Sequence, residues 1–302
     1  MDGGIDDALA LILAMKTHKL EVSGITAVSG NVSVDQATIN ALRVVELVGR
    51  ENVWVARGLA KPLVRDPIRA TNFHGKDGLG DSRLPQPKLK PRKNDALDQL
   101  FFELASSHKR ELTIIATGPL TNIGALFTKE PDATRRIKEI SIMGGAYGLT
   151  EYGIGNETPT AEFNIYSDPE AARIVFASGV PLRAVGLDVT MMPAAQLSLN
   201  DYSSIKRSTS RIARFASRIL ARAMRKKRFA LHDPMAVAAV SNPSMFTFEN
   251  LPVVVETRGE YTTGMTVSDR RLVRSKNAKT VSVCSDLKTE SFRRMVVSAL
   301  TS

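Results

Sequence analysis

The chain opens with Met1-Asp2-Gly3-Gly4-Ile5-Asp6-Asp7, in which three carboxylates precede an apolar helical run at residues 8–14. Crowded carboxylates repel one another and raise each other's pKa unless a cation neutralises them. An all-oxygen group of this kind suits Ca2+ or Mg2+. The same residues also fit the acidic first turn of a helix, where the helix dipole favours aspartate. The stretch predicts a helix after the acids and leaves both explanations of the acids open.

Short runs rich in valine and isoleucine alternate with helical patterns along the chain. Strands are expected at residues 22–28, 52–56, 112–116, 140–143, 181–187, 252–256 and 280–284. Helices are expected at residues 6–17, 34–48, 96–106, 120–127, 169–177, 206–228, 234–240 and 290–300. This alternation predicts an α/β fold, a mainly parallel open sheet with helices on both faces. No linker or repeat divides the pattern, so we expect one domain over residues 1–302.

The acidic turn should itself follow a strand, because the helix expected at residues 6–17 needs a sheet to pack on. A buried parallel strand of about five apolar residues contributes on the order of 10 kcal/mol by its buried area. That is comparable with the net stability of a whole domain. We therefore expect the first strand to be missing from this chain, with Met1 at the end of a strand that begins upstream.

The composition is that of an ordinary globular protein, with 43% hydrophobic and 24% charged residues among 302. No stretch approaches the roughly 18 apolar residues that a membrane span needs, and no basic region precedes the first apolar run. A membrane partner is therefore not expected. The single cysteine, Cys284, excludes an internal disulfide and a cysteine-rich zinc site, and it favours a reducing cytoplasm.

The net charge is +10, concentrated in the proline-broken loop at residues 85–93 and in residues 206–228. In the second segment arginines recur every three or four residues, at Arg207, Arg211, Arg214, Arg218, Arg222 and Arg225. A basic protein can bind nucleic acid or an anionic surface. No aromatic residues interleave with the arginines as a base-stacking platform requires. The pattern favours a solvated helix face or a subunit contact, and nucleic acid is not an expected partner.

Polar loops follow several of the expected strands, and in such sheets ligands bind beyond the carboxyl ends of the strands. These loops include Ser29-Gly30-Asn31, Thr117-Gly118-Pro119 and Gly144-Gly145-Ala146. Late in the chain, His232-Asp233-Pro234 opens a helix. His74 is expected in a glycine-rich loop rather than in a helix. The sequence therefore predicts a site at the carboxyl edge of the sheet.

Taken together, these loops resemble the nucleoside hydrolases of the inosine–uridine-preferring superfamily. That family opens with a strand ending in Asp-x-Asp-Pro-Gly-x-Asp-Asp-Ala, and residues 2–8 match its second half, with Gly3 where proline is usual. Seven further motifs follow in the family's order: Gly30-Asn31, Asn40-Ala41, His74-Gly75-x-Asp77-Gly78-Leu79-Gly80, Thr117-Gly118-Pro119-Leu120-Thr121-Asn122, Met143-Gly144-Gly145-Ala146, Ala161-Glu162-Phe163-Asn164-Ile165-Tyr166-Ser167-Asp168-Pro169-Glu170-Ala171 and His232-Asp233-Pro234.

The resemblance implies a Rossmann-like core and Ca2+-dependent hydrolysis of the N-glycosidic bond of ribonucleosides to ribose and free base. It implies that Ca2+ is held by Asp2, Asp7, Asp233 and the backbone carbonyl of Thr117. Asp2 would accept the proton of the attacking water, and His232 would protonate the leaving base. The positions that match the family's ribose contacts are Asp6, Asn31, Asn156, Glu162 and Asn164.

Several alternatives stay open at this stage. His74 could contact the base or could be a structural histidine. A Mg2+-dependent phosphoryl-transfer enzyme ranks low, because the acidic loops offer no nearby lysine or arginine for a phosphate. A non-catalytic nucleoside- or nucleic-acid-binding protein is the runner-up. His232 favours an inosine–uridine or pyrimidine preference, in base salvage or nucleoside catabolism. The family resemblance also implies a homodimer or homotetramer.

Overall fold

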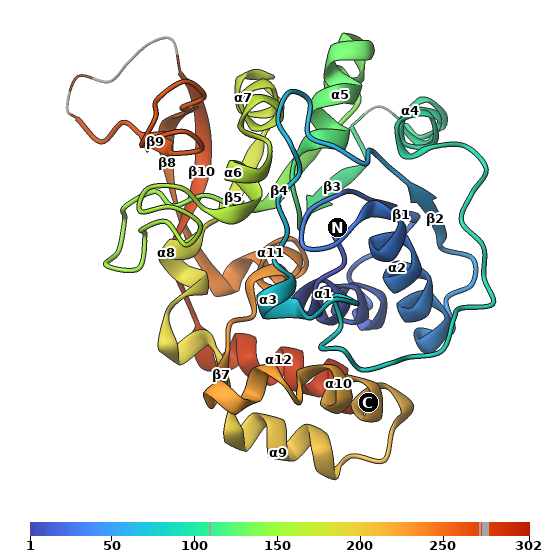
Figure 1. Cartoon of the computed structure of the whole chain (residues 1–302). Coiled ribbons are helices and arrows are strands. Elements are labelled where there is room, and N and C mark those ends of the chain that lie inside the picture. The colour runs from blue at the N-terminus through green and yellow to red at the C-terminus, as the bar shows by residue number, and fades with distance from the viewer. Residues whose placement is uncertain (109, 272, 274–277) are drawn as a thin grey trace.

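The computed structural model describes residues 1–108, 110–271, 273 and 278–302. Its main sheet has the strand order β3-β4-β5-β10-β8-β9, and β1 and β2 form a separate parallel pair (Figure 1). Strands β3 to β5 and β10 run parallel, whereas β8 and β9 are antiparallel to their neighbours. The bounds are β1 (Gly24–Ala27), β2 (Trp54–Arg57), β3 (Thr113–Ala116), β4 (Glu139–Met143), β5 (Leu182–Val185), β8 (Phe246–Val255), β9 (Thr266–Ser268) and β10 (Lys279–Leu287). The predicted mainly parallel α/β sheet is confirmed.

Helices cover both faces of this sheet, as successive residues of β4 show. Ile140 and Ile142 pack in one apolar core with α5 (Thr121–Lys129) and α7 (Pro169–Ala177). Ser141, between them, points to the other face, and its hydroxyl donates a 3.1 Å hydrogen bond to the Ala236 carbonyl. That face carries the larger core, built from α1 (Ile5–Lys16), α2 (Val34–Val48), α11 (His232–Ser241) and α12 (Thr289–Thr301).

Three helices begin at a side chain that caps their free backbone N–H groups. The Ser33 hydroxyl accepts from the Gln36 N–H at the start of α2, and Gly49 ends that helix in the left-handed conformation. Asp95 caps α4 (Ala96–Ser106), and Asp168 caps α7 ahead of a proline. The predicted bounds of α2, α4 and α7 are confirmed.

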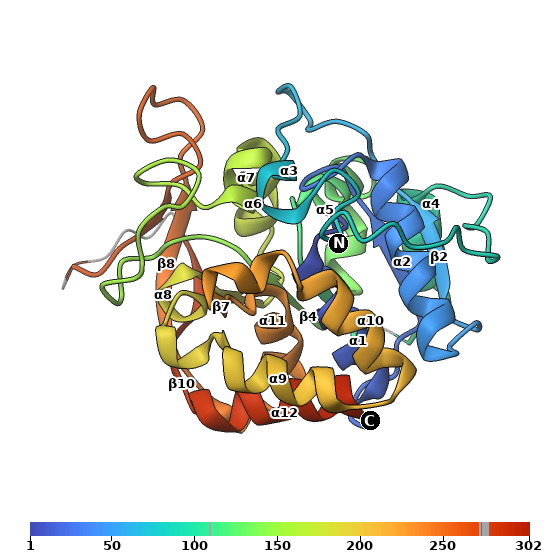
Figure 2. The same cartoon turned by 60° about the horizontal axis from the view of Figure 1, so that its bottom comes forward.

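The prediction of one arginine-rich helix over residues 206–228 was wrong. The segment contains the end of α9 (Leu199–Arg207), then α10 (Arg211–Leu220), a 3-10 turn η3 (Ala223–Lys226) and the short strand β7 (Arg228–Phe229), which pairs with β6 (Leu197–Ser198). The break falls at residues 208–210, because the Ser210 hydroxyl accepts from the Ala213 N–H and starts a new helix. Helices α9, α10 and α12 lie together at one end of the molecule (Figures 1 and 2).

Short elements complete the chain: α3 (Thr71–His74), α6 (Phe163–Ser167), α8 (Leu187–Thr190), η1 (Pro131–Arg135), η2 (Pro193–Ala195) and η4 (Pro243–Met245). His74 is the last residue of α3, so the expectation that it lies outside a helix was wrong. A single turn is too short to show a helical pattern in the sequence. No helix in the described part of the chain is both long and apolar enough to cross a membrane.

The N-terminal residues lie alongside β1. The Met1 amino group donates to the Thr26 carbonyl at 3.1 Å, and the Val28 N–H donates to the Met1 carbonyl at 3.0 Å. Asp2 is thereby placed where β1 ends. The strands β1, β3 and β4 lead at their carboxyl ends into polar loops, so the predicted site edge exists in the fold.

Candidate active site

Helices α1 and α11 pack side by side (Figure 1), and three carboxylates meet in their first turns. Asp6, Asp7 and Asp233 each place one oxygen within 4.8 Å of the others, and all three are buried. The Asp7 carboxylate accepts from the Gly4 N–H at 2.8 Å and from the Thr117 hydroxyl at 2.7 Å. Thr117 thus reaches the acidic turn from the end of β3. Two of the expected cation ligands, Asp7 and Asp233, thus share a cluster with Asp6, which the resemblance assigns to the ribose, and the expected ligand Asp2 is not one of these three.

One buried carboxylate oxygen of Asp6, Oδ1, has no hydrogen-bond partner among the described residues, and Asp6 as a whole is only 5% exposed. An unpaired buried carboxylate oxygen is costly, and a cation or a substrate hydroxyl would relieve that cost. The donor set, oxygen only and rich in carboxylates, fits a hard cation.

Asp2 is fully buried next to this cluster, and Asn31 holds both of its oxygens. The Asn31 backbone N–H donates to Asp2 Oδ2 at 2.7 Å, and the Asn31 side-chain amide donates to Oδ1 at 2.9 Å. Two glycines press against it: a Cβ on Gly30 would lie 2.0 Å from Asp2 Oδ2, and one on Gly118 would lie 2.9 Å from Asp2 Cβ. Both loop positions therefore require glycine.

The four carboxylates lie within electrostatic reach of one another. Burial, followed by repulsion from Asp7, raises the pKa of Asp6 to about 8 and the pKa of Asp2 well above its ordinary value. Burial, followed by repulsion from Asp6, Asp7 and Asp2, also raises the pKa of Asp233 well above its ordinary value. A cation among them would reverse this repulsion. The electrostatics therefore agree with the donor chemistry.

Two histidines accompany the cluster: His74 contacts it from α3, and His232 directly precedes Asp233 in α11. His74 Nδ1 accepts from the Ile5 N–H at 3.1 Å and lies 3.8 Å from Asp6 Oδ1, so the neutral ring carries its proton on Nε2. Burial lowers the pKa of His74 to about 3. His232 Nδ1 lies 2.8 Å from the Thr190 hydroxyl, and burial lowers the pKa of His232 to about 4.

Glu162 and Asn164 are buried at the end of β4. Glu162 caps α6: its carboxylate accepts from the N–H groups of Asn164 at 2.9 Å, Ile165 at 3.1 Å and Gly145 at 3.0 Å. Burial raises the pKa of Glu162 to about 6, and its charge helps to raise the pKa of Asp6. The Asn164 amide donates to the Met143 carbonyl at 3.1 Å. Glu162 therefore combines a capping role with proximity to the acids.

Asn156 differs from the other predicted ribose contacts. It is exposed, and its side-chain oxygen accepts from the Phe163 N–H at 2.9 Å, which ties its loop to the start of α6. The structure thus gathers Asp2, Asp6 and Asn31 around the acidic turn, and leaves Asn156 on a surface loop that leads to Glu162.

Two contacts at the site join segments that are far apart in the sequence. Asn40 donates to the Gly3 carbonyl at 2.9 Å and to the Asp77 carbonyl at 2.8 Å, so it ties the acidic turn to the loop after His74. In the sequence, Asn40 is marked only as part of the Asn40-Ala41 motif of the family resemblance. No pattern connects Thr190 with His232, because the two residues come from separate segments.

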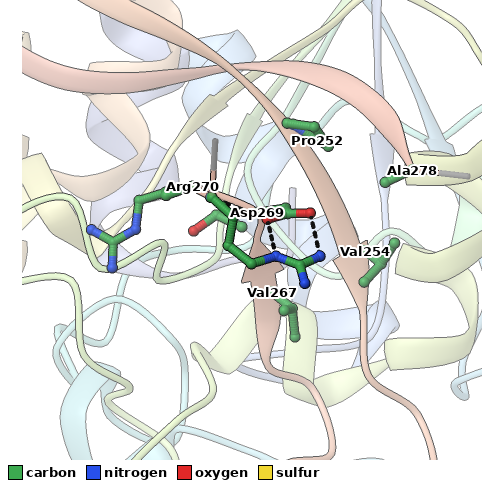
Figure 3. Close-up of a pocket in the computed structure, with 8 residues that line it drawn as sticks. Pro252, Val254, Val267, Asp269, Arg270 and Ala278 are labelled. Atoms are coloured by element: carbon green, nitrogen blue, oxygen red, sulfur yellow. Dashed lines mark hydrogen bonds and ion pairs between the residues drawn. The ribbon is translucent and has the colours of Figure 1, made fainter. Parts of the chain in front are cut away.

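A cleft of about 680 Å3 lies over β8 and β9 (Figure 3). Pro252, Val254 and Val267 line it, and the Arg271 guanidinium pairs there with the Asp269 carboxylate at 2.9 Å. Its lining contains none of the clustered aspartates or histidines. The acid cluster is therefore the better candidate for the chemistry.

A family model described as inosine-uridine preferring nucleoside hydrolase matches residues 1–294. The chain belongs to this family of metal-dependent N-glycosyl hydrolases. It is 41% identical over 276 residues to the pyrimidine-specific ribonucleoside hydrolase RihA of Citrobacter koseri, covering 89% of this chain and 86% of that protein.

Solved structures agree with this assignment. The plant nucleoside hydrolase PpNRh1 superposes with a TM-score of 0.91 at 32% identity, covering 100% of this chain and 97% of that one. A purine-preferring ribonucleoside hydrolase from Gardnerella vaginalis gives a TM-score of 0.88 at 29% identity, covering 100% and 96%.

Proposed function

We propose that this protein hydrolyses the N-glycosidic bond of pyrimidine ribonucleosides, releasing ribose and free base for salvage or catabolism, with Ca2+ as its cation. The observation that carries the proposal is the buried cluster of Asp6, Asp7 and Asp233 with its unsatisfied Asp6 oxygen. The pyrimidine preference is supported by the name of the RihA relatives at 41% identity. We extend the proposal to residues 1–302 as one hydrolase domain, supported by the family match over residues 1–294.

The proposed cation ligands are Asp2, Asp7, Asp233 and the Thr117 carbonyl. Support comes from the position of Thr117, whose hydroxyl already binds Asp7, and from the mutual repulsion of the carboxylates. When bound, Ca2+ would supply positive charge that keeps these carboxylates ionised and lowers the pKa of an adjacent water. Asp6 would then be left to bind a ribose hydroxyl through its free oxygen.

Asp2 would accept the proton of the attacking water. The two N–H donors of Asn31 fix the orientation of the Asp2 carboxylate and favour its ionised form. Gly30 and Gly118 let the neighbouring loops approach it without steric conflict. Because the Asp2 carboxylate is already oriented, its reorientation adds nothing to the activation free energy of proton transfer.

The ribose would bind between the acidic turn and the start of α6, in contact with Asp6, Asn31, Asn156, Glu162 and Asn164. Cleavage of a glycosidic bond passes through an oxocarbenium-like transition state, in which positive charge develops on the sugar. The carboxylates of Asp6 and Glu162 are close enough to influence each other's charge. Together they would stabilise that positive charge by preorganised electrostatics.

The leaving base would meet the two histidines. When His232 is protonated on both ring nitrogens, its Nδ1–H would donate to the Thr190 hydroxyl and its Nε2 proton would pass to the leaving base, which leaves a neutral imidazole. His74 carries its proton on Nε2, because its Nδ1 accepts from Ile5. We propose His232 as the proton donor and His74 as a base contact. A cytoplasmic location and a homodimer or homotetramer stay predictions.

The test is the release of reducing sugar from uridine, cytidine, inosine and adenosine, with Ca2+ and after chelation. Uridine and cytidine should be cleaved fastest, and chelation should abolish cleavage until Ca2+ is restored. 2′-Deoxyuridine is the control for ribose recognition and should be cleaved poorly. Cleavage that survives chelation would contradict the cation, and a preference for inosine would contradict the pyrimidine assignment. A Ca2+-loaded, folded protein that cleaves none of them would overturn the proposal.

A further inference from the structure

Residues 71–81 form a compact unit around His74, which we call the His74 loop. The Gly80 N–H donates to the His74 carbonyl at 2.7 Å. The Asp77 carboxylate accepts from the N–H groups of Leu79 and Asp81, both at 2.8 Å, and Asp81 Oδ1 accepts from the Lys76 N–H at 2.6 Å. With so many internal hydrogen bonds, the loop should move as one piece.

The His74 loop contacts the acidic turn on its inner side, through His74 on the Ile5 N–H and Asp77 on Asn40. Its outer side contacts the chain from α10 to β7 (Figure 2). The rings of Phe73 and Phe229 stack with centroids 6.0 Å apart, and Lys226 Nζ lies 5.3 Å from the centroid of the Phe73 ring. The loop is therefore held between the site and this segment.

Arg222 makes the charged contacts of this outer side. One guanidinium nitrogen forms an ion pair with the Asp81 carboxylate, and another donates to the Asn72 carbonyl at 3.3 Å. One planar fork thus holds both the beginning and the end of the loop, a geometry that lysine cannot reproduce. Asp81 has a left-handed backbone (φ 55), which persists in a residue with a side chain only where its surroundings hold it.

We propose that Arg222 is a positioning residue: through Asp81 and Asn72 it holds the His74 loop in place, and so sets the position of His74 against the base. The inference rests on the proposed function, in which His74 contacts the base. It assigns a role to one arginine of the stripe at residues 206–228, which the sequence left without one.

Arg218 provides a matched contrast, one helical turn earlier on the same basic segment. Its side chain is exposed, and its guanidinium makes no hydrogen bond or ion pair with the part of the chain that the structure describes. Removing either guanidinium changes the net charge of the protein equally. Only the loss of Arg222 should release the loop.

The experiment compares Arg222→Gln, Arg222→Lys, Asp81→Asn and the double variant Arg222→Gln/Asp81→Asn with Arg218→Gln. Arg222→Gln should raise the KM for uridine about five- to tenfold, with a smaller change in kcat, as expected for loss of one charge-assisted contact. Inhibition by free ribose should stay unchanged, because the sugar contacts lie on other segments. Arg222→Lys should fall between Arg222→Gln and the wild type.

Asp81→Asn should match Arg222→Gln, and the double variant should lose no more than either single change, because both break one interaction. Arg218→Gln should behave as the wild type.

The inference is overturned if Arg222→Gln and Arg218→Gln have the same KM for uridine, or if ribose affinity and melting temperature fall together with the affinity for uridine. If Arg222→Gln does not fold, Asp81→Asn decides. A wild type that cleaves no nucleoside overturns the proposed function and this inference together, whereas active wild type with unchanged Arg222→Gln and Asp81→Asn overturns this inference alone.

Discussion

The acid cluster and the arginine stripe are both groups of like charge, but they lie in opposite environments. Asp2, Asp6 and Asp233 are buried, and burial with mutual repulsion raises their pKa values. Arg214 and Arg218 point into water from α10. The number of charges in a segment therefore says little about function, whereas the burial of charges without sufficient partners points directly to a ligand.

The largest effect is expected from Asp2→Asn. The amide keeps the shape of the carboxylate and can still accept one hydrogen bond from Asn31, but it cannot take a proton from water. We expect kcat for uridine to fall by about 10²- to 10⁴-fold. Steady-state hydrolysis rates measure this.

Asp132→Asn is the control for that prediction, because Asp132 is exposed and its ion pair, with Arg135 at 3.2 Å, lies within one turn at the surface. It should keep the wild-type rate. A similar loss in both variants, or near-normal turnover by Asp2→Asn, would show that the buried acids do not differ from the surface acids in the way proposed.

A second effect concerns stability against pH. The pKa of Asp6 is about 8 in the folded protein and 3.8 for an ordinary aspartate, so between these values the folded state holds a proton that the unfolded state has released. Stability must then fall as pH rises, by up to about 1.4 kcal/mol per pH unit for one such group. Above pH 6.5 the histidines contribute little, because their folded pKa values lie below their ordinary value of 6.5.

Melting curves at pH 6.5, 7.5 and 8.5 measure this effect. In chelator the melting temperature should decrease with pH. In Ca2+ the decrease should be smaller, because the ion favours the ionised carboxylates. At a Ca2+ concentration of 100 Kd, the bound ion should add about 2.7 kcal/mol to the free energy of unfolding, and the melting temperatures should rise accordingly. A melting temperature that rises with pH in chelator would contradict the raised pKa values.

The smallest effect is expected on the stripe. Replacing Arg214 and Arg218 together by glutamine should change the free energy of unfolding by no more than about 0.5 kcal/mol, because both side chains are exposed. Uridine hydrolysis should be unchanged, while elution from a cation-exchange column should come at lower salt. A large loss of stability or of activity would show that Arg214 and Arg218 contribute to folding or catalysis although both side chains are exposed.

Sequence reasoning succeeded where local signals decide structure. The bounds of α2, α4 and α7 were predictable because Ser33, Asp95 and Asp168 cap these helices through hydrogen bonds within a few residues. It failed at residues 208–210, where the arginine spacing continues across a break that the Ser210 cap imposes. It also missed β9, because a strand of three residues is too short to show a pattern in the sequence and is defined by its pairing with β8.

The same division applies to the site. The acidic turn and His232-Asp233 were recognisable as motifs, because neighbouring residues supply the chemistry. The contacts of His232 with Thr190 and of Arg222 with Asp81 were not, because each joins segments that are far apart in sequence. Glu162 shows a third case, in which one carboxylate caps α6 and also lies near the acids, so that neither explanation excludes the other.

The placement of Asp7 and Asp233 at the starts of α1 and α11 has a topological consequence. An ion shared by them would close a loop of roughly 220 residues, for which the chain entropy of closure is on the order of 5 kcal/mol. Ca2+ would therefore act as a reversible cross-link between the first helix of the chain and a helix that begins at residue 232. Its removal should loosen the contact between α1 and α11 first, and slow amide exchange in α1 would depend on the ion as much as on the apolar core beneath it.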